Sequence, residues 1–345
     1  MHKSNYFPGL DLLRFFSAFW VMSFHYLLGL TAALSWYRYG NLGVPLFFII
    51  SGFVISYSIS NKSIRQFAQG RFVRLAPIFW IICTLTYVFT LLMPNGNPVR
   101  LPEYFISMTM LGDKLSSALG YGGLVDPVYW SLTVEILFYV GIGLFVYFFS
   151  WKNIRYFLWG WLLVSMAAFA LHIDNTFAMK TLLVRHASYF IFGATFALIQ
   201  LTDYTSKKLQ NLDIVLLVTT AIYSTFISYR ALPPYFVVNP RDTAIVTLLH
   251  PVFFIGFILL IFLSRYITSN KALSFFMILG GITYPLYLIH QTVGRTILNY
   301  LDGSAPRLAL VGSMMALAIL LGYFAYRFDE AIRKKLNILL GFKKI

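Results

Sequence analysis

Two ionisable residues, Arg14 and His25, lie inside one long apolar run of the sequence, LDLLRFFSAFWVMSFHYLLGLTAAL. They are eleven residues apart, about three turns of an α-helix, so both would point to the same side, roughly 16 Å apart along the axis. Asp11 precedes Arg14 by three residues and is within reach to pair with it. A charged group in hydrocarbon costs about 2.5 to 3.5 kcal/mol. This face must therefore contact protein or water, either as a structural ion pair with a hydrogen-bonded histidine or as part of a functional site.

The chemistry available to such residues is proton transfer and anion binding. A neutral imidazole can accept the proton of a hydroxyl group as that hydroxyl attacks a carbonyl. A second basic pair, Arg71 and Arg74, lies three residues apart before the apolar run that begins at 75. Two guanidinium groups on one side of a helical turn can hold a phosphate or pyrophosphate through paired hydrogen bonds. Positive charge retained on the cytoplasmic side of a membrane would explain the same residues without a ligand.

Further polar residues interrupt other apolar runs. Glu135 follows Trp130 in the stretch WSLTVEILFY, and Ser51 lies in GVPLFFIISGF. A carboxylate at this depth must be paired or protonated, so Glu135 either orients an imidazole or holds helices together. Ser51 is a candidate nucleophile, or a hydroxyl that bonds its own helix. Tyr284 and His290 lie in the stretch TYPLYLIH, and with Trp130 they are candidate supporting or acceptor-side residues.

Other features of the apolar runs favour structural roles. Gly43 and Gly52 are expected to allow close approach of neighbouring helix backbones. His250 precedes Pro251, and a histidine in that setting is expected to be structural. The single cysteine, Cys83, lies in an apolar run and is interpreted as a small buried hydrophobic residue.

These residues belong to a very apolar chain of 345 residues, of which 59% are hydrophobic and 11% are charged, against about 25% charged in soluble domains. A spanning helix needs about 20 mostly apolar residues. We therefore predict an all-α polytopic membrane protein with about ten transmembrane helices. The predicted helices are 10–34, 41–60, 75–93, 128–149, 156–172, 182–201, 212–230, 244–264, 273–293 and 307–326.

Basic residues predict the orientation of these helices. Lys and Arg are more frequent in the segments on the side of the N-terminus, including the tail RKKLNILLGFKK, and this excess predicts that both termini are cytoplasmic. Because loops account for the formal charge of +15, we exclude a nucleic acid as partner. We predict one membrane domain over 1–330 and a short basic cytoplasmic tail over 331–345.

The predicted topology separates two kinds of chemistry. His25, Glu135, His250 and His290 would lie in the outer half of the membrane. Arg14, Arg71 and Arg74 would lie at the inner face. This separation predicts a site that is reached from both sides, with an anionic group held inside and proton transfer further out.

The longest outer segment, 94–127, is the candidate for contact with an acceptor. Its stretch EYFISMTML is predicted to form an amphipathic helix in the membrane interface. Tyr104, Tyr121 and Asp126 are suited to stacking on a sugar and to hydrogen bonding with it.

Five stretches, taken in order, resemble the integral-membrane acyltransferase family 3, which includes bacterial sugar and peptidoglycan O-acetylases. The resemblance covers essentially the whole chain and is specific because all five occur at the right depth. They are the pair Arg14 and His25 with ten residues between them, GVPLFFIISGF, the pair Arg71 and Arg74, WSLTVEILFY and TYPLYLIH.

The resemblance implies transfer of an acetyl group from cytoplasmic acetyl-CoA, a co-substrate, to a carbohydrate hydroxyl at or beyond the outer face of the bacterial inner membrane. O-antigen, exopolysaccharide and lipid-linked sugars are candidate acceptors. No metal is expected. The implied catalytic residues are His25, Glu135 and Ser51, the donor-binding residues are Arg14, Arg71 and Arg74, and the supporting or acceptor-side residues are Asp11, Trp130, Tyr284 and His290.

Other function classes also place ionisable residues in membranes. A proton-coupled transporter is one alternative, although the inverted repeats common in carriers are not visible in the sequence. A receptor or scaffold gives no reason to set arginines opposite a histidine. An acyltransferase that acts on a small metabolite is a further alternative. Many members of the family carry an extra outer hydrolase-like domain, and we expect the stand-alone form here.

Overall fold

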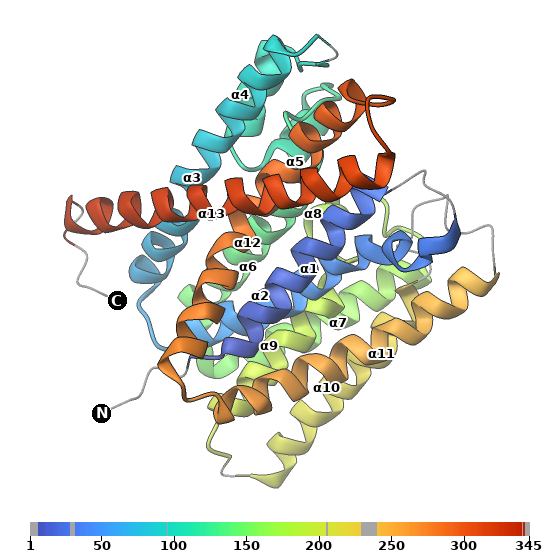
Figure 1. The fold of residues 1–345 in the computed structure, drawn as a ribbon. Helices are drawn as coiled ribbons and strands as arrows, with labels where there is room; N and C mark the ends of the chain where they lie inside the picture. Colours follow the sequence, from blue (N-terminus) through green and yellow to red (C-terminus); the bar gives the residue numbers. More distant parts are fainter. Residues whose placement is uncertain are drawn as a thin grey trace. The chain divides into compact units, whose positions relative to one another are not determined.

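The computed structural model describes residues 6–27, 32–94, 96–204, 206–228, 240–339 and 341, and within them every regular element is a helix (Figure 1). The predicted all-α class is therefore confirmed for the described chain. The elements are α1 (Pro8–Leu27), η1 (Ala32–Leu42), α2 (Gly43–Ile59), α3 (Ile64–Leu92), α4 (Leu101–Met108), α5 (Gly112–Ala118), α6 (Tyr129–Phe149), η2 (Trp151–Asn153), α7 (Ile154–Ala170), α8 (Phe177–Thr181), α9 (Ala187–Leu201), α10 (Lys207–Ile227), α11 (Pro240–Leu263), η5 (Ser264–Tyr266), α12 (Asn270–Tyr300) and α13 (Arg307–Leu339).

A helix occupies each of the ten predicted segments, and seven helices are long and apolar enough to cross a membrane. α1, α7 and α9 are not among these seven. A total of ten spans and the cytoplasmic position of both termini stay predictions. The seven candidate spans are Trp36–Ile59, Ile64–Leu92, Tyr129–Phe149, Lys207–Ile227, Asp242–Tyr266, Asn270–Tyr300 and Arg307–Leu339.

Several helices differ in length from the apolar runs that predicted them. α3 begins at Ile64, eleven residues before the predicted run, and α13 continues from the predicted end at 326 to Leu339. Hydropathy marks where hydrocarbon is favourable, whereas a helix can continue as a polar, solvated segment. The predicted tail 331–345 is therefore helical as far as Leu339, and its residues 340 and 342–345 lie outside the described part of the chain.

The chain forms two compact units. The first comprises residues 1–43, 68–136 and 267–345. Within it, α1 packs along α12, and α12 packs along α13. A β-carbon at Gly43 would lie 2.6 Å from the carbonyl oxygen of Ser17, so the predicted close approach at this glycine is confirmed. This unit contains both ends of the described chain.

The second unit comprises residues 44–67 and 137–266. Here α2 and α9 interlock through two glycines. A β-carbon at Gly52 would overlap the carbonyl of Phe190, and one at Gly193 would lie 2.7 Å from the Phe53 amide nitrogen. The predicted packing role of Gly52 is therefore confirmed, because no larger residue fits there without separating the two helices.

Buried polar contacts complete the second unit. Arg155 of α7 makes a bidentate ion pair with Asp213 of α10, and both N···O distances are 2.7 Å. His250 is buried, and its Nδ1 lies 2.8 Å from the Val246 carbonyl while its Nε2 lies 2.9 Å from the Tyr189 hydroxyl. Both ring nitrogens are thus occupied, which agrees with the predicted structural role of this histidine.

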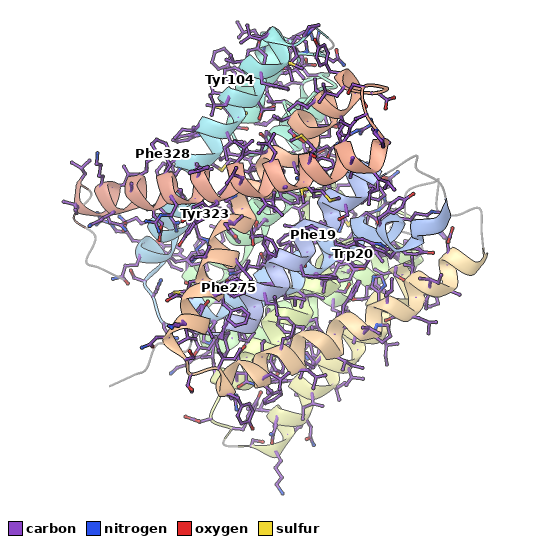
Figure 2. The ribbon with its side chains drawn as sticks, viewed as in Figure 1. Phe19, Trp20, Tyr104, Phe275, Tyr323 and Phe328 are labelled. Carbon is purple, nitrogen blue, oxygen red and sulfur yellow. The ribbon has the colours of Figure 1, made fainter. Side chains whose placement is uncertain are left out.

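Large apolar side chains are exposed along many helices. Phe275 on α12 and Phe328 on α13 are 57% and 55% exposed (Figure 2). Leucine and phenylalanine side chains are likewise exposed along α10 and α11. Soluble proteins rarely leave such extended apolar surfaces in water. Together with the seven apolar helices, this surface indicates a multi-pass membrane protein.

Cysteine labelling tests the predicted orientation. Lys207, at the start of α10, and Ser117, in α5, are both exposed, and the native Cys83 is buried. We expect Ser117→Cys to react with a membrane-impermeant maleimide in intact cells and Lys207→Cys to react only after the cells are opened. Reaction of Lys207→Cys in intact cells, with Ser117→Cys protected, would reverse the orientation.

Candidate active site

α1 and α12 bring two histidines together. The ring centroids of His25 and His290 are 5.2 Å apart, and the rings are inclined at 42°. His25 is partly exposed, whereas His290 is completely buried. The pair unites residues from opposite ends of the sequence because α1 packs along α12. His25 is therefore the more accessible imidazole of the pair.

The hydrogen bonds of His290 define its tautomer. Its Nδ1 lies 2.8 Å from the carbonyl oxygen of Tyr287. A carbonyl only accepts, so Nδ1 carries the hydrogen and Nε2 has a free lone pair. This Nε2 is buried, and it has no hydrogen-bond partner among the residues that the structure describes. Because an unsatisfied buried acceptor costs about 1 to 3 kcal/mol, this position is suited to receive a proton donor.

Contacts with two other helices hold the His290 region of α12 in place. The Tyr287 hydroxyl lies 2.8 Å from Ser131 Oγ of α6. The Tyr284 hydroxyl donates to the Leu75 carbonyl of α3 at 3.3 Å. Trp130 is half-buried in the first turn of α6. Tyr284 therefore connects α12 with α3, and its role as an acceptor-side or supporting residue stays a prediction.

A second polar cluster surrounds Arg14. Its Nη1 lies 3.0 Å from Asp11 Oδ1, which confirms the predicted ion pair. The Tyr6 hydroxyl donates to the other Asp11 oxygen at 2.7 Å. Arg14 also interacts electrostatically with Arg74 of α3 and Glu135 of α6. Two guanidinium groups thus lie near one another, each within reach of carboxylates.

Glu135 connects this cluster with the histidine region. It is half-buried and interacts electrostatically with Arg14 and with Tyr287. The sequence predicted Glu135 in the outer half, with the histidines. Its depth in the membrane stays a prediction; along α6 it lies six residues after Tyr129, about 9 Å along the helix axis.

The extension of α13 adds an acidic residue that the sequence analysis missed. Asp329 is buried, its Oδ2 lies 2.9 Å from Arg333 Nε, and it interacts electrostatically with Arg74. α13 can approach α12 closely because a β-carbon at Gly281 would overlap the ring of Tyr326. Asp329 and Arg333 are four residues apart, a spacing that predicts an ion pair within a helix. This pair was missed because the predicted helix ended at 326.

The other predicted site residues are placed as follows. Arg71 and Arg74 are half-buried in α3, so with Arg14 they are the candidates for holding an anionic co-substrate. Ser51 is half-buried on α2 in the second unit, and its catalytic role stays a prediction. In the described ranges, no three His, Cys, Asp or Glu side chains gather as a metal-binding group.

Comparison with known proteins identifies the family. The sequence matches the acyltransferase domain family over residues 7–327. The chain belongs to the acyltransferase-3 family. This match includes His25, His290 and the three candidate arginines.

Relatives of the acyltransferase-3 family match over different lengths. O-acetyltransferase OatA of Staphylococcus aureus is 26% identical over 383 residues, covering 99% of this chain and 59% of the relative. YrhL of Bacillus subtilis, a candidate peptidoglycan O-acetyltransferase, is 28% identical over 158 residues, covering 40% of this chain and 24% of YrhL. The chain thus spans less than two thirds of either protein. No solved structure matches it.

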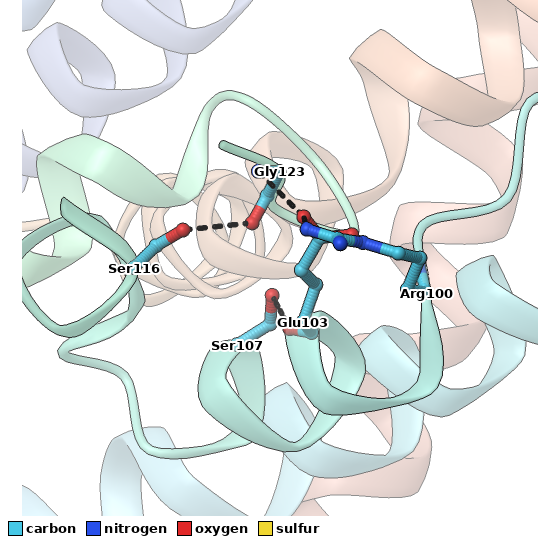
Figure 3. Close-up of polar contacts among 5 residues, drawn as sticks. All are labelled: Arg100, Glu103, Ser107, Ser116 and Gly123. Atoms are coloured by element: carbon cyan, nitrogen blue, oxygen red, sulfur yellow. Dashed lines mark hydrogen bonds and ion pairs between the residues drawn. The ribbon is translucent and has the colours of Figure 1, made fainter. Parts of the chain in front are cut away.

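In this acyltransferase-3 chain, the segment 96–127, which is predicted to lie on the outer side, forms a folded cap built around Glu103. Figure 3 shows that Glu103 accepts hydrogen bonds from the Arg100 side chain at 2.9 Å and from the Gly123 amide at 3.2 Å. The Ser107 hydroxyl donates to the Glu103 carbonyl at 2.8 Å, and the Ser116 hydroxyl donates to the Gly123 carbonyl at 3.4 Å. One carboxylate therefore connects both ends of the cap.

The helix predicted from EYFISMTML is confirmed as α4. Its polar residues Glu103 and Ser107 face inward and are buried, whereas Leu101 and Phe105 are 56% and 61% exposed. An outward apolar face is what contact with membrane lipid requires. The position of α4 in the interface stays a prediction.

The residues predicted to contact a sugar have different environments. Tyr104 stacks on Tyr87 with centroids 4.6 Å apart and shares a hydrogen bond with Thr84 at 3.0 Å. Tyr121 is partly exposed, with the Arg100 guanidinium 5.1 Å from its ring centroid. Asp126 is completely buried. Of the three predicted sugar contacts, Tyr121 therefore has a partly exposed ring, whereas Tyr104 stacks on another ring and Asp126 is buried.

The cap should respond to acid through Glu103. The Arg100 guanidinium and the Arg100 and Gly123 amides lower the pKa of Glu103 to about 2, below the unfolded value of about 4.3. Its carboxylate therefore stabilises the cap fully above about pH 4.5, and this contribution is lost as the pH falls from about 4 towards 2.

We expect Glu103→Gln to accelerate amide hydrogen exchange of cap peptides at pH 7. The difference from wild type should disappear near pH 2, after correction for the intrinsic pH dependence of exchange. Equal protection in both proteins at pH 7 would show that the Glu103 carboxylate does not hold the cap.

Proposed function

We propose that the chain transfers an acetyl group from cytoplasmic acetyl-CoA to a carbohydrate hydroxyl at or beyond the outer face of the bacterial inner membrane. The observation that carries this proposal is the contact of His25 with His290, whose buried Nε2 is available as an acceptor. Membership of the acyltransferase-3 family and the names of its relatives support O-acetyl transfer.

The reaction needs one proton acceptor and one leaving group. The acceptor oxygen attacks the thioester carbonyl of acetyl-CoA, and the new ester C–O bond forms as the C–S bond breaks. An imidazole of the His25 and His290 pair takes the hydroxyl proton and returns it to the departing thiolate, so that CoA leaves as the thiol. Atoms and charge then balance without any other reactant.

Direct transfer is favoured over an acyl-enzyme intermediate. With two imidazoles together, the base and the proton donor for the thiolate are both present. Ser51 or His25 as an acyl carrier is the alternative. Brief reaction with radiolabelled acetyl-CoA and no acceptor, followed by acid precipitation, should leave the protein unlabelled, whereas a stable label would favour the carrier.

The donor would be held at the Arg14 cluster. The phosphates of acetyl-CoA are multiply charged. Arg14, Arg71 and Arg74 are half-buried guanidinium groups of the first unit, and such groups can make paired hydrogen bonds to phosphate. Asp11, Glu135 and Asp329 neutralise part of this positive charge before the donor arrives.

The chemical class of the acceptor is inferred from the name of a relative and from an aromatic ring in the cap. One relative, YrhL, is named as a candidate peptidoglycan O-acetyltransferase, and the cap contains the partly exposed Tyr121 ring, whose face can stack on a sugar. We infer a carbohydrate acceptor such as O-antigen or exopolysaccharide, presented on a lipid carrier.

Release of CoA thiol by the purified protein tests the proposal. Protein in nanodiscs, supplied with acetyl-CoA, should release thiol faster when a lipid-linked glycan is added, and the glycan should gain the mass of an acetyl group. Acetylation of a small metabolite alone would support the metabolite-directed alternative. Proton-coupled uptake without any acetyl transfer would instead indicate a transporter.

A further inference from the structure

Asp126 is the last acidic residue of the cap, and it is fully buried. Its Oδ1 accepts a hydrogen bond from the Val128 amide at 3.0 Å, at the start of α6. Its Oδ2 accepts one from the Thr292 amide of α12 at 2.8 Å. Both carboxylate oxygens are thus used inside the protein, so Asp126 has an internal role.

The bond to Thr292 is unusual because Thr292 lies in the interior of α12. In a regular α-helix this amide donates to the carbonyl four residues earlier. Asp126 therefore supplies an acceptor from outside α12 to the turn that also carries His290, two residues before Thr292.

The environment of Asp126 includes the other histidine-bearing helix. Tyr26 follows His25 in α1, is buried, and interacts electrostatically with Asp126. A β-carbon at Gly294 of α12 would overlap the Tyr26 ring, so α1 and α12 are also in close contact at Tyr26. Asp126 thus lies next to the neighbours of both His25 and His290.

The ionisation of Asp126 suits this role. Burial raises its pKa to about 6, and the hydrogen bonds from the Thr292 and Val128 amides limit the rise. At neutral pH it is an anion, and hydrogen bonds to charged groups are stronger than those between neutral groups.

We propose that Asp126 is a positioning residue for the His25 and His290 pair. By holding the Thr292 amide, it fixes the turn of α12 that carries His290 and joins that turn to the cap. A sugar bound against the cap would then have its hydroxyl group at a fixed position relative to the two imidazoles. This inference rests on the proposed acetyl transfer for its kinetic consequence, but its structural consequence is independent of any activity.

Amide hydrogen exchange and kinetics of full-length protein in nanodiscs test it together. Asp126→Ala should accelerate exchange in peptides covering 288–296 by about 10-fold or more, the effect of losing one charge-assisted hydrogen bond. With a lipid-linked glycan as acceptor, kcat should fall about 100-fold, as expected for a misplaced reacting group. The KM for acetyl-CoA should stay within about twofold of wild type, since the Arg14 cluster is unchanged.

Asp113→Asn is the matched control. Asp113 is a carboxylate of the same segment that pairs with the neighbouring Lys114 at 3.0 Å. This variant should equal wild type in both measurements. If Asp126→Ala does not insert, Asp126→Asn keeps the side-chain size but offers only one acceptor oxygen, and it should show the same changes at smaller amplitude.

Exchange that increases only within the cap, with 288–296 protected as in wild type, would overturn the proposal. Faster exchange in 288–296 with unchanged kcat would likewise exclude a positioning role. If wild-type protein transfers no acetyl group, the proposed function fails, while the exchange of 288–296 still decides whether Asp126 holds α12.

Discussion

Replacing His25 with alanine is expected to lower the rate of acetyl transfer by about 10² to 10⁴-fold, the usual contribution of a positioned general base. His25 is the partly exposed member of the histidine pair, so it is the imidazole that a hydroxyl would meet. Binding of acetyl-CoA, measured by calorimetry on protein in nanodiscs, should stay close to wild type because the Arg14 cluster is intact.

Two further variants separate catalysis from packing at this position. His25→Gln keeps a hydrogen-bonding side chain of similar size but cannot take up a proton in this pH range, so it should be nearly as inactive as His25→Ala. His290→Gln should also lose most of the rate, because Nε2 of His290 is the neighbouring acceptor. A folded His25→Gln protein that acetylates at close to the wild-type rate would assign His25 a structural role.

Replacing Arg74 with alanine is expected to weaken acetyl-CoA binding about 10- to 100-fold, since a hydrogen bond to a charged group contributes about 1.5 to 3 kcal/mol. Arg74 is half-buried and lies in the electrostatic environment of Arg14 and Asp329. Arg74→Lys should restore little affinity, because a lysine cannot make a paired contact with phosphate. Equilibrium binding of radiolabelled acetyl-CoA measures both effects.

The control for Arg74 is another arginine of the same helix. Arg65 is exposed in the first turn of α3, so Arg65→Ala removes the same charge without removing a half-buried guanidinium. We expect it to bind acetyl-CoA as wild type does. If Arg74→Ala and Arg71→Ala both bind acetyl-CoA with unchanged affinity, these arginines do not bind the donor and serve only to orient the helices in the membrane.

The long helices of this protein could be predicted from hydropathy because each coincides with a long apolar run of the sequence. The Asp11 and Arg14 pair was also predictable, since both residues belong to one helix and spacing determines their contact. Contacts between distant parts of the chain were not predictable in this way. The approach of His25 to His290 depends on the packing of α1 along α12, which no local pattern encodes.

Two other features escaped prediction for definable reasons. Asp126 looked like a sugar ligand because a polar residue in an outer loop is usually solvated. It is instead fully buried, and its carboxylate accepts a hydrogen bond from the Thr292 amide of α12. Asp329 was assigned to the region beyond the last apolar helix, and only the continuation of α13 to Leu339 places it beside Arg333 and near Arg74.

The most direct measurement of transfer across the membrane uses proteoliposomes in which the protein has one orientation. Radiolabelled acetyl-CoA is supplied on the side that bears Lys207, and a lipid-linked glycan with its sugar on the opposite side. We expect labelled acetyl ester on the glycan in this arrangement, little when the donor is moved to the other side, and none with His25→Ala. Labelling that requires donor and glycan headgroup on the same side would contradict a site reached from both faces of the membrane.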